Sequence, residues 1–134
     1  MTKREMVKKS VEYKHSGCNC CQAVVRALTE GMELDEEMLV NIGSAFGSGM
    51  GCMKGNCGAL VGANIAAGLM GKGKCAKKIY QRFEKLTGAT ICGEIKGKTG
   101  GEVLSSCDNC VKNAVRAAYD ILELKESRQD TENC

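Results

Sequence analysis

The amino-acid sequence predicts an all-α fold, a single-domain bundle of about five or six helices around a central apolar helix rich in glycine and alanine. Three observations support this prediction. The chain of 134 residues contains no proline, the residue that most strongly interrupts helices. Apolar residues recur at spacings of three and four in several segments, and no stretch of useful length alternates between apolar and polar residues as a half-buried strand does.

The N-terminal third of the chain contains three expected helices. Each has an apolar stripe at helical spacing and a residue suited to cap or end the helix. The stripes and their boundary residues are Met6, Val7 and Val11 before Ser16 and Gly17; Val24, Ala27 and Leu28 between Asn19 and Gly31; and Leu39, Ile42 and Phe46 after Asp35.

The central part of the chain is rich in glycine, with seven glycines between positions 43 and 62. Most of them are unsuited to the interior of a stable helix, so residues 47–51 are expected to form a loop with unusual backbone angles. Asn56 is expected to cap an apolar helix over residues 57–70. In that helix Gly58, Gly62 and Ala66 recur every four residues, a stripe that would let another helix approach closely.

The C-terminal half contains two more amphipathic helices separated by a loop over residues 90–105, which carries Cys92. Glycine ends the first of these helices and serine caps the second. Their apolar positions are Ala76, Ile79, Tyr80, Phe83 and Leu86 before Gly88, and Val111, Ala114, Val115, Ala118 and Leu122 after Ser106.

Composition excludes several classes of function. The net charge is only +3, with 19 basic and 16 acidic residues intermixed, and aromatic residues are few, so no nucleic-acid-binding face is expected. The longest uncharged run, residues 55–71, is just too short to cross a bilayer, so no membrane partner is expected. The first residues lack the apolar stretch of a secretory signal, which favours the cytoplasm. There, ten cysteines indicate metal binding or redox chemistry rather than disulfide staples.

Three cysteines, Cys20, Cys57 and Cys107, stand in the first turns of expected helices. Free backbone N–H groups and the positive end of the helix dipole favour an anion there, so each thiol is expected to have a lowered pKa. Together with Cys92 they would supply four inward-facing thiols from four separate segments, which suggests one shared site. Soft thiolates select iron–sulfur clusters, zinc or copper(I).

The sequence resembles the redox-active C_GCAxxG_C_C family from about Tyr13 to Leu122. The resemblance is carried by residues 57–62, which read CGAxxG, by the glycine-rich segment 46–51 and by residues 17–24. Cys107 is preferred to Cys110 because it stands four residues before Val111 and seven before Ala114. The resemblance implies a redox role, and related modules attached to multi-haem cytochromes imply an iron–sulfur centre. Its four defining cysteines map to Cys20, Cys57, Cys92 and Cys107.

The leading hypothesis is that residues 1–125 form a single helical cysteine-rich redox domain, followed by a polar tail over residues 126–134. In this hypothesis Cys20, Cys57, Cys92 and Cys107 bind an iron–sulfur cluster that exchanges electrons with a redox protein partner. Homodimerisation is plausible. Two alternatives stay open. One is a metal-independent thiol–disulfide oxidoreductase that uses two of the same cysteines. The other is a structural zinc protein. A separate zinc site could use the CxxC pairs Cys18/Cys21 and Cys107/Cys110, although the gap between the pairs is long. No role is assigned to the remaining six cysteines, Cys18, Cys21, Cys52, Cys75, Cys110 and Cys134.

Overall fold

The computed structural model describes residues 1–98 and 100–124, so the tail predicted for residues 126–134 and Cys134 lie outside it. The predicted all-α class is confirmed. The described part of the chain contains seven α-helices, six of them eight residues or longer. They are α1 (Lys3–His15), α2 (Cys20–Leu28), α3 (Glu36–Gly43), α4 (Gly58–Leu69), α5 (Ala76–Thr87), α6 (Cys92–Ile95) and α7 (Cys107–Leu122), with short turns at Gly49–Met53 and Gly73–Cys75.

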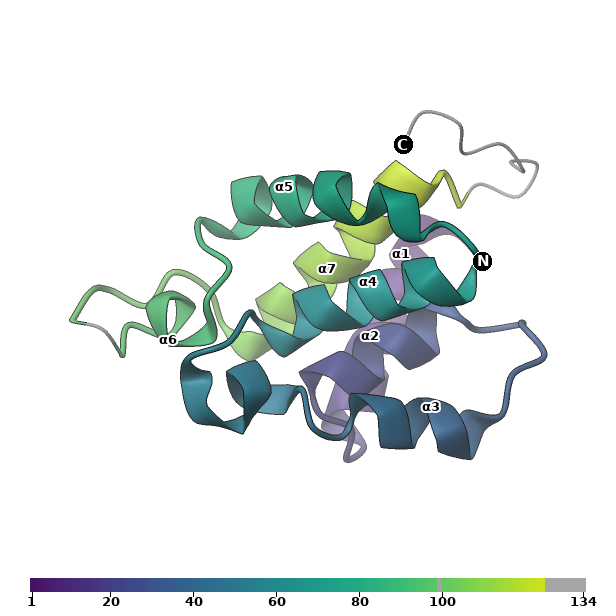
Figure 1. The fold of residues 1–134 in the computed structure, drawn as a ribbon, viewed down its shortest axis with the longest axis horizontal. Helices are drawn as coiled ribbons and strands as arrows, with labels where there is room; N and C mark the ends of the chain where they lie inside the picture. Colours follow the sequence, from purple (N-terminus) through teal and green to yellow (C-terminus); the bar gives the residue numbers. More distant parts are fainter. Residues whose placement is uncertain (99, 125–134) are drawn as a thin grey trace.

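Helix α4 lies at the centre of the bundle and packs against α2, α5 and α7 (Figure 1). Helix α1 covers α2 and α7, and α3 packs against α2. The approach of α2 to α4 depends on Gly62, because a Cβ atom there would stand 2.7 Å from the carbonyl oxygen of Cys21. The predicted small-residue stripe thus brings these two helices together at Gly62. No helix in residues 1–98 or 100–124 is long and apolar enough to cross a bilayer.

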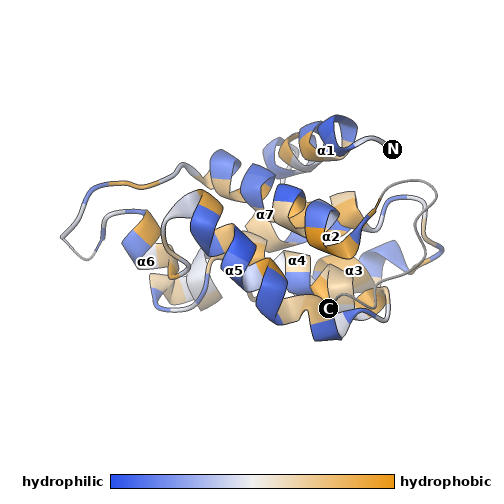
Figure 2. Cartoon of the chain, turned by 90° about the horizontal axis from the view of Figure 1, so that it is seen from above, coloured by the Kyte–Doolittle hydropathy of each residue, from blue (hydrophilic) through white to orange (hydrophobic). Residues whose placement is uncertain are grey.

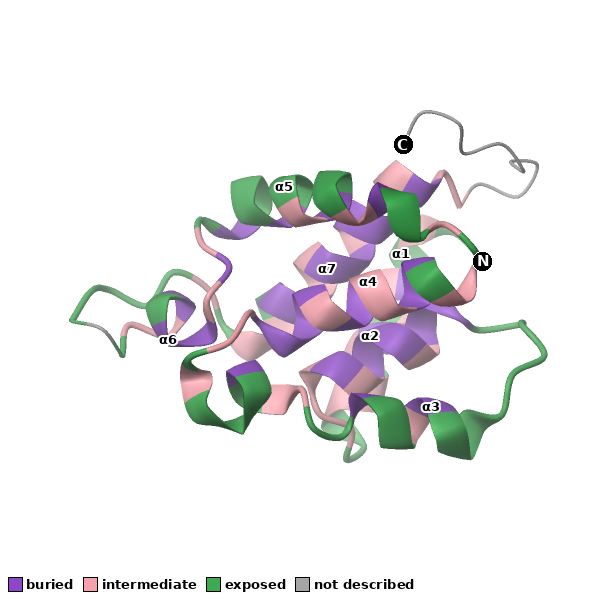
Figure 3. Ribbon diagram, in the orientation of Figure 1, coloured by how far each residue is buried: buried purple, intermediate pink, exposed green. Residues whose placement is uncertain are grey.

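The core follows most of the predicted apolar stripes, although Ile42, expected on the same face as Leu39, is 39% exposed. Buried residues concentrate on the facing sides of α2, α4 and α7, and hydrophilic residues cover the outer sides of α1 and α5 (Figures 2 and 3). In α5 the inward positions are Ile79 and Phe83, both fully buried, followed by Thr87. Leu86, which was expected on this inward face, is instead 42% exposed.

Three of the predicted helix caps are present. The side chains of Asn19, Asp35 and Ser106 each accept a hydrogen bond from the backbone N–H three residues later. The predicted cap at Asn56 is wrong, because Cys57 is itself the N-cap residue of α4 and makes no side-chain cap bond. Asn56 instead pairs with Ile91 in an isolated antiparallel bridge. The segment expected to be a loop after residue 90 contains the short helix α6.

The glycine-rich segment between α3 and α4 has the unusual backbone expected for it. Positive φ angles occur at Ser48, Gly49, Met50, Gly51 and Met53. At Gly49 the absence of a side chain is required by packing, because a Cβ atom would stand 2.4 Å from the Cβ atom of Cys92. The segment therefore folds tightly over the start of α6.

Candidate functional site

The four cysteines predicted to share a site lie around one small cavity. Cys20, Cys57, Cys92 and Cys107 all line it, although they are up to 87 positions apart in the sequence. A fifth cysteine, Cys110, lines the same cavity. The other lining residues are Ser48, Gly58, Ile95 and Lys96. The spatial convergence of sulfurs from four helix starts is therefore present in the fold.

Backbone hydrogen bonds hold two of these helix starts side by side. The N–H of Cys57 donates to the carbonyl oxygen of Thr90 at 2.7 Å, and the N–H of Cys92 donates to the carbonyl oxygen of Gly55 at 3.0 Å. The Asn56–Ile91 bridge thus places the starts of α4 and α6 next to each other. The segment before α7 joins them through the N–H of Leu104, which donates to Ile95 at 2.8 Å. In Figure 1, α4 and α7 begin on the side of the bundle where α6 lies.

Each of the four predicted cysteines stands at the start of a helix. Cys20, Cys92 and Cys107 are the first residues of α2, α6 and α7. Cys57 is the N-cap of α4, and the backbone N–H groups at positions 59 and 60 act to lower the pKa of its thiol. Such N–H groups stabilise negative charge on sulfur.

The expectation of a lowered pKa is nevertheless wrong for Cys20 and Cys57. Burial raises the pKa of Cys20 to about 12, with further contributions from charge on Cys107 and Cys57. The pKa of Cys57 is raised first by its hydrogen bond to Cys110 and then by burial, which together outweigh the backbone N–H groups. Burial also raises the pKa of Cys92. Without a cation these sulfurs retain their protons at neutral pH, because neighbouring thiolates in a water-poor site repel one another.

The sequence analysis did not predict that two further residues, Cys110 and Lys96, lie beside the four thiols. The neighbouring Cys57 thiol is the main cause of the lowered pKa of Cys110. Burial would lower the pKa of Lys96, but the nearby sulfurs of Cys107 and Cys92 raise it. Helical spacing offered a signal for both, since Cys110 lies three positions after Cys107 and Lys96 four after Cys92.

The other described cysteines lie apart from the cavity. Cys18 accepts a hydrogen bond from Nη1 of Arg26 at 3.5 Å, and Cys52 is exposed on the glycine-rich segment. Cys21 is fully buried in a separate apolar cluster with Val25 and Leu39. Cys75 is buried at the start of α5. The zinc site built from two CxxC pairs is therefore not assembled, because neither Cys18 nor Cys21 reaches the cavity.

The cavity is small. Its volume is about 10 Å³, close to the minimum that a single water molecule needs. Within residues 1–98 and 100–124, no three Cys, His, Asp or Glu side chains are already arranged as a set of metal ligands. The donor atoms thus suit a soft metal, but the thiols must rotate outward to enclose one. A cluster requires more of this movement than a single ion.

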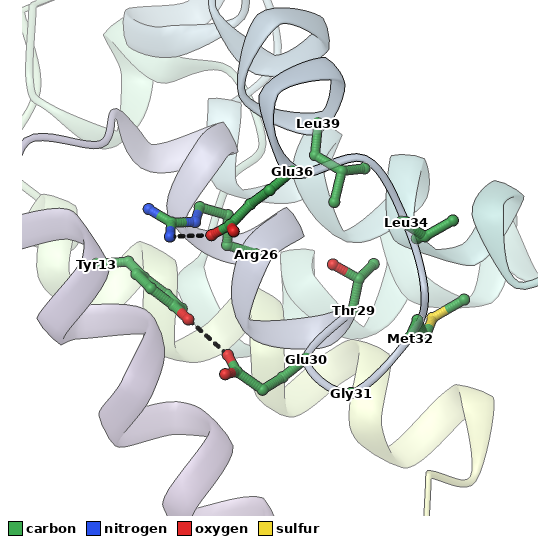
Figure 4. Close-up of a pocket in the computed structure, with 9 residues that line it drawn as sticks. All are labelled: Tyr13, Arg26, Thr29, Glu30, Gly31, Met32, Leu34, Glu36 and Leu39. Carbon is green, nitrogen blue, oxygen red and sulfur yellow. Dashed lines mark hydrogen bonds and ion pairs between the residues drawn. The ribbon is translucent and has the colours of Figure 1, made fainter.

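A larger cavity of about 150 Å³ lies where α1, the end of α2 and the start of α3 meet (Figure 4). Four of its polar side chains are paired with one another, although the Nε atom of Arg26 is buried without a hydrogen-bond partner. The hydroxyl of Tyr13 donates to Glu30 at 2.6 Å, and Arg26 forms an ion pair with Glu36 while lying 4.2 Å from the centre of the Tyr13 ring. This cavity contains no thiol, so the cysteine-lined cavity is the better candidate for redox chemistry.

Comparison with known proteins agrees with this site. The family model described as "Putative redox-active protein (C_GCAxxG_C_C)" matches residues 18–121, a range that contains all five cavity cysteines. No curated protein and no solved structure matches the chain. The family model covers well over half of the sequence, and the chain therefore belongs to the C_GCAxxG_C_C family, whose members are described as redox-active proteins.

Proposed function

We propose that this protein binds an iron–sulfur cluster through the thiolates of Cys20, Cys57, Cys92 and Cys107 and transfers electrons to or from a redox protein partner. The observation that carries the proposal is that these four sulfurs, from four different helix starts, line one cavity. Four cysteine thiolates are the usual ligands of such clusters, and the bound cluster would supply one-electron chemistry.

The surroundings of the four sulfurs are suited to a negatively charged centre. The backbone N–H groups of Ala59 and Leu60 point at the Cys57 sulfur, and the Lys96 side chain hydrogen-bonds to Cys107. Gly49 lets the backbone approach Cys92 more closely than any other residue would allow. Hydrogen bonds and positive charge near cluster sulfurs raise the reduction potential, so these groups would set the potential of the site.

Metal binding must displace protons from the site, because Cys20, Cys57 and Cys92 have raised pKa values. A cation compensates the charge that the thiols otherwise avoid by remaining protonated. Uptake of metal should therefore release protons and strengthen as the pH rises.

The test is the metal and sulfide content of protein purified without oxygen. The proposal predicts a brown protein that contains iron and acid-labile sulfide in comparable amounts. A protein that stays colourless and iron-free after anaerobic reconstitution with iron and sulfide would rule the proposal out. Zinc in place of iron would support the structural zinc alternative. The small volume of the cavity favours that alternative, because one ion needs less space than a cluster.

A second candidate function is thiol–disulfide chemistry without a metal. The observation that favours it is that Cys57 and Cys110 line the same cavity and shift each other's pKa. This function predicts that two cysteines cycle between dithiol and disulfide in metal-free protein and that activity survives treatment with a chelator.

A further inference from the structure

A groove between α1 and α7 gathers basic side chains from the two ends of the chain. The two helices pack against each other, and the groove has a volume of about 360 Å³, a size suited to a small molecule. Charges that are intermixed along the sequence are therefore concentrated here in three dimensions. Four of the seven residues that line the groove are basic: Arg4 and Lys8 from α1, and Lys112 and Arg116 from α7. The other three are Val7, Val11 and Glu12.

Two polar contacts fix the register of α1 against α7. Near the start of α1, Nζ of Lys3 lies 2.9 Å from Oδ1 of Asp120, and at its end Nε2 of His15 lies 2.8 Å from Oδ2 of Asp108. The helices are therefore antiparallel, because the start of each lies beside the end of the other. In this register the middle of α1 faces the middle of α7, so basic side chains stand on both walls of the groove.

The four basic side chains are available to an anionic ligand. Within residues 1–98 and 100–124, none of them forms an ion pair. The half-buried Arg116 is held in place, because its Nη1 donates a hydrogen bond to Oδ1 of Asn113 at 3.1 Å. Asn113 is in turn anchored to α5, since its Nδ2 donates to Oγ1 of Thr87 at 3.1 Å. This support orients a guanidinium whose remaining N–H groups suit phosphate oxygens.

The lining matches a ligand that carries several negative charges at one end and an uncharged part at the other. Arg4 precedes Lys8 by about one helical turn, roughly 6 Å along the helix axis. Arg116 lies close to the level of Lys8 on the facing helix, as the register of the two helices requires. Three cations placed in this way suit an anion with more than one charged group, such as a diphosphate. The two valines offer apolar surface beside them.

We propose that the groove between α1 and α7 binds a nucleoside diphosphate, with the diphosphate among the basic side chains and the nucleoside against Val7 and Val11. The Glu12 carboxylate, which also lines the groove, can accept a hydrogen bond from a sugar hydroxyl. A second copy of the chain does not fit this face, because it would bring the same cations together. The inference goes beyond the proposed metal-binding function, since the groove shares no lining residue with the cysteine-lined cavity.

The experiment is isothermal titration calorimetry of the full-length protein, in reductant, with adenosine diphosphate, inorganic pyrophosphate, adenosine and polyglutamate as separate probes. We expect both diphosphates to bind and adenosine alone not to bind. Adenosine diphosphate should bind about tenfold more tightly than pyrophosphate, because its nucleoside also covers apolar surface. The affinity for both diphosphates should fall as the salt concentration rises, because the attraction depends on exposed charges.

Two variants locate the binding in the groove. Lys8→Gln and Arg116→Gln should each weaken binding of adenosine diphosphate about tenfold, because each removes a charged hydrogen-bond donor. Lys85→Gln removes the same charge from an exposed position on α5 outside the groove and should bind as the wild type does. Lys8 is exposed, so its replacement disturbs no packing, and circular dichroism checks the helix content of all three variants.

Three results would overturn the inference. They are no binding of either diphosphate, equal affinity of the wild type and Lys8→Gln for adenosine diphosphate, and binding of polyglutamate as tightly as adenosine diphosphate. The last result would instead point to an acidic protein segment as the occupant of the groove. None of these titrations involves a metal, so their outcome is independent of the iron and sulfide analysis that tests the proposed function.

Discussion

The contact between Gly49 and Cys92 yields the sharpest stability prediction for this fold. In the substitution Gly49→Ala, the new methyl group would stand 2.4 Å from the Cβ atom of Cys92 and 2.9 Å from the carbonyl oxygen of Gly55. Neither atom is the free end of a flexible side chain, so the backbone must move. Gly49 also has a φ of +59°, which alanine adopts only with strain.

Both effects have known magnitudes. The left-handed backbone costs about 1–2 kcal/mol for a residue with a Cβ atom, and overpacking a tight contact costs about 1–3 kcal/mol more. Gly49→Ala should therefore lower the free energy of unfolding by about 2–5 kcal/mol. It should also weaken metal binding, because the methyl group displaces Cys92 from the cavity.

A matched control separates strain from collision. Gly51 has a φ of +78°, and nothing lies within 4 Å of a Cβ atom placed there. Gly51→Ala should therefore lose only about 1–2 kcal/mol and keep its metal affinity. Guanidinium unfolding of both variants, metal-free and in reductant, measures the two losses. Equal losses would refute the packing of this segment on Cys92.

Three further predictions concern the core, the pH dependence and the charge of the site. Gly62→Ala should lose about 1–2 kcal/mol of unfolding free energy because its methyl group collides with α2. Gly68→Ala should instead gain about 0.5–1 kcal/mol, because position 68 on the same helix faces open space. Urea unfolding of the two variants measures the difference. Above pH 9 the thiols of the unfolded chain ionise, whereas Cys20 in the folded protein keeps its proton to about pH 12. The free energy of unfolding of the metal-free protein should therefore fall by about 1.4 kcal/mol per pH unit for such a thiol. Unfolding at pH 8 and pH 10 measures this fall, and an unchanged stability would contradict the raised pKa. Lys96→Met should weaken Co²⁺ binding about tenfold, because the Lys96 side chain lies against the thiol sulfurs. Lys98→Met serves as a nearly neutral control. Equal Co²⁺ titration curves for the two variants would show that Lys96 does not stabilise the bound metal.

Much of the fold could be predicted because the signals that set it are local. Asn19 and Ser106 cap the helices that follow them, and the apolar stripe of α7 is buried as its spacing indicates. The helix α6 was missed because four residues are too few to show a periodic pattern. The start of α4 was misplaced by one residue because a distant group, the carbonyl oxygen of Thr90, holds the backbone of Cys57.

The site shows the same division between local and distant causes. The grouping of Cys20, Cys57 and Cys107 at helix starts could be read from the sequence, and the fold brings them to one cavity. The direction of the pKa shifts of Cys20 and Cys57 could not be predicted from the sequence, because the groups that bury these thiols and the neighbouring sulfurs come from other segments of the chain. For the same reason, the presence of Cys110 beside Cys57 in the cavity becomes evident only in three dimensions.

The most direct test of the shared site is the iron content, per chain, of single Cys→Ala variants reconstituted without oxygen. Variants at Cys20, Cys57, Cys92 and Cys107 should each lose most of the iron, because every one of these sulfurs faces the same cavity. The variant at the exposed Cys52 should keep it. Full iron content in any of the first four variants, or its loss at Cys52 alone, would contradict a single centre held by these four thiolates.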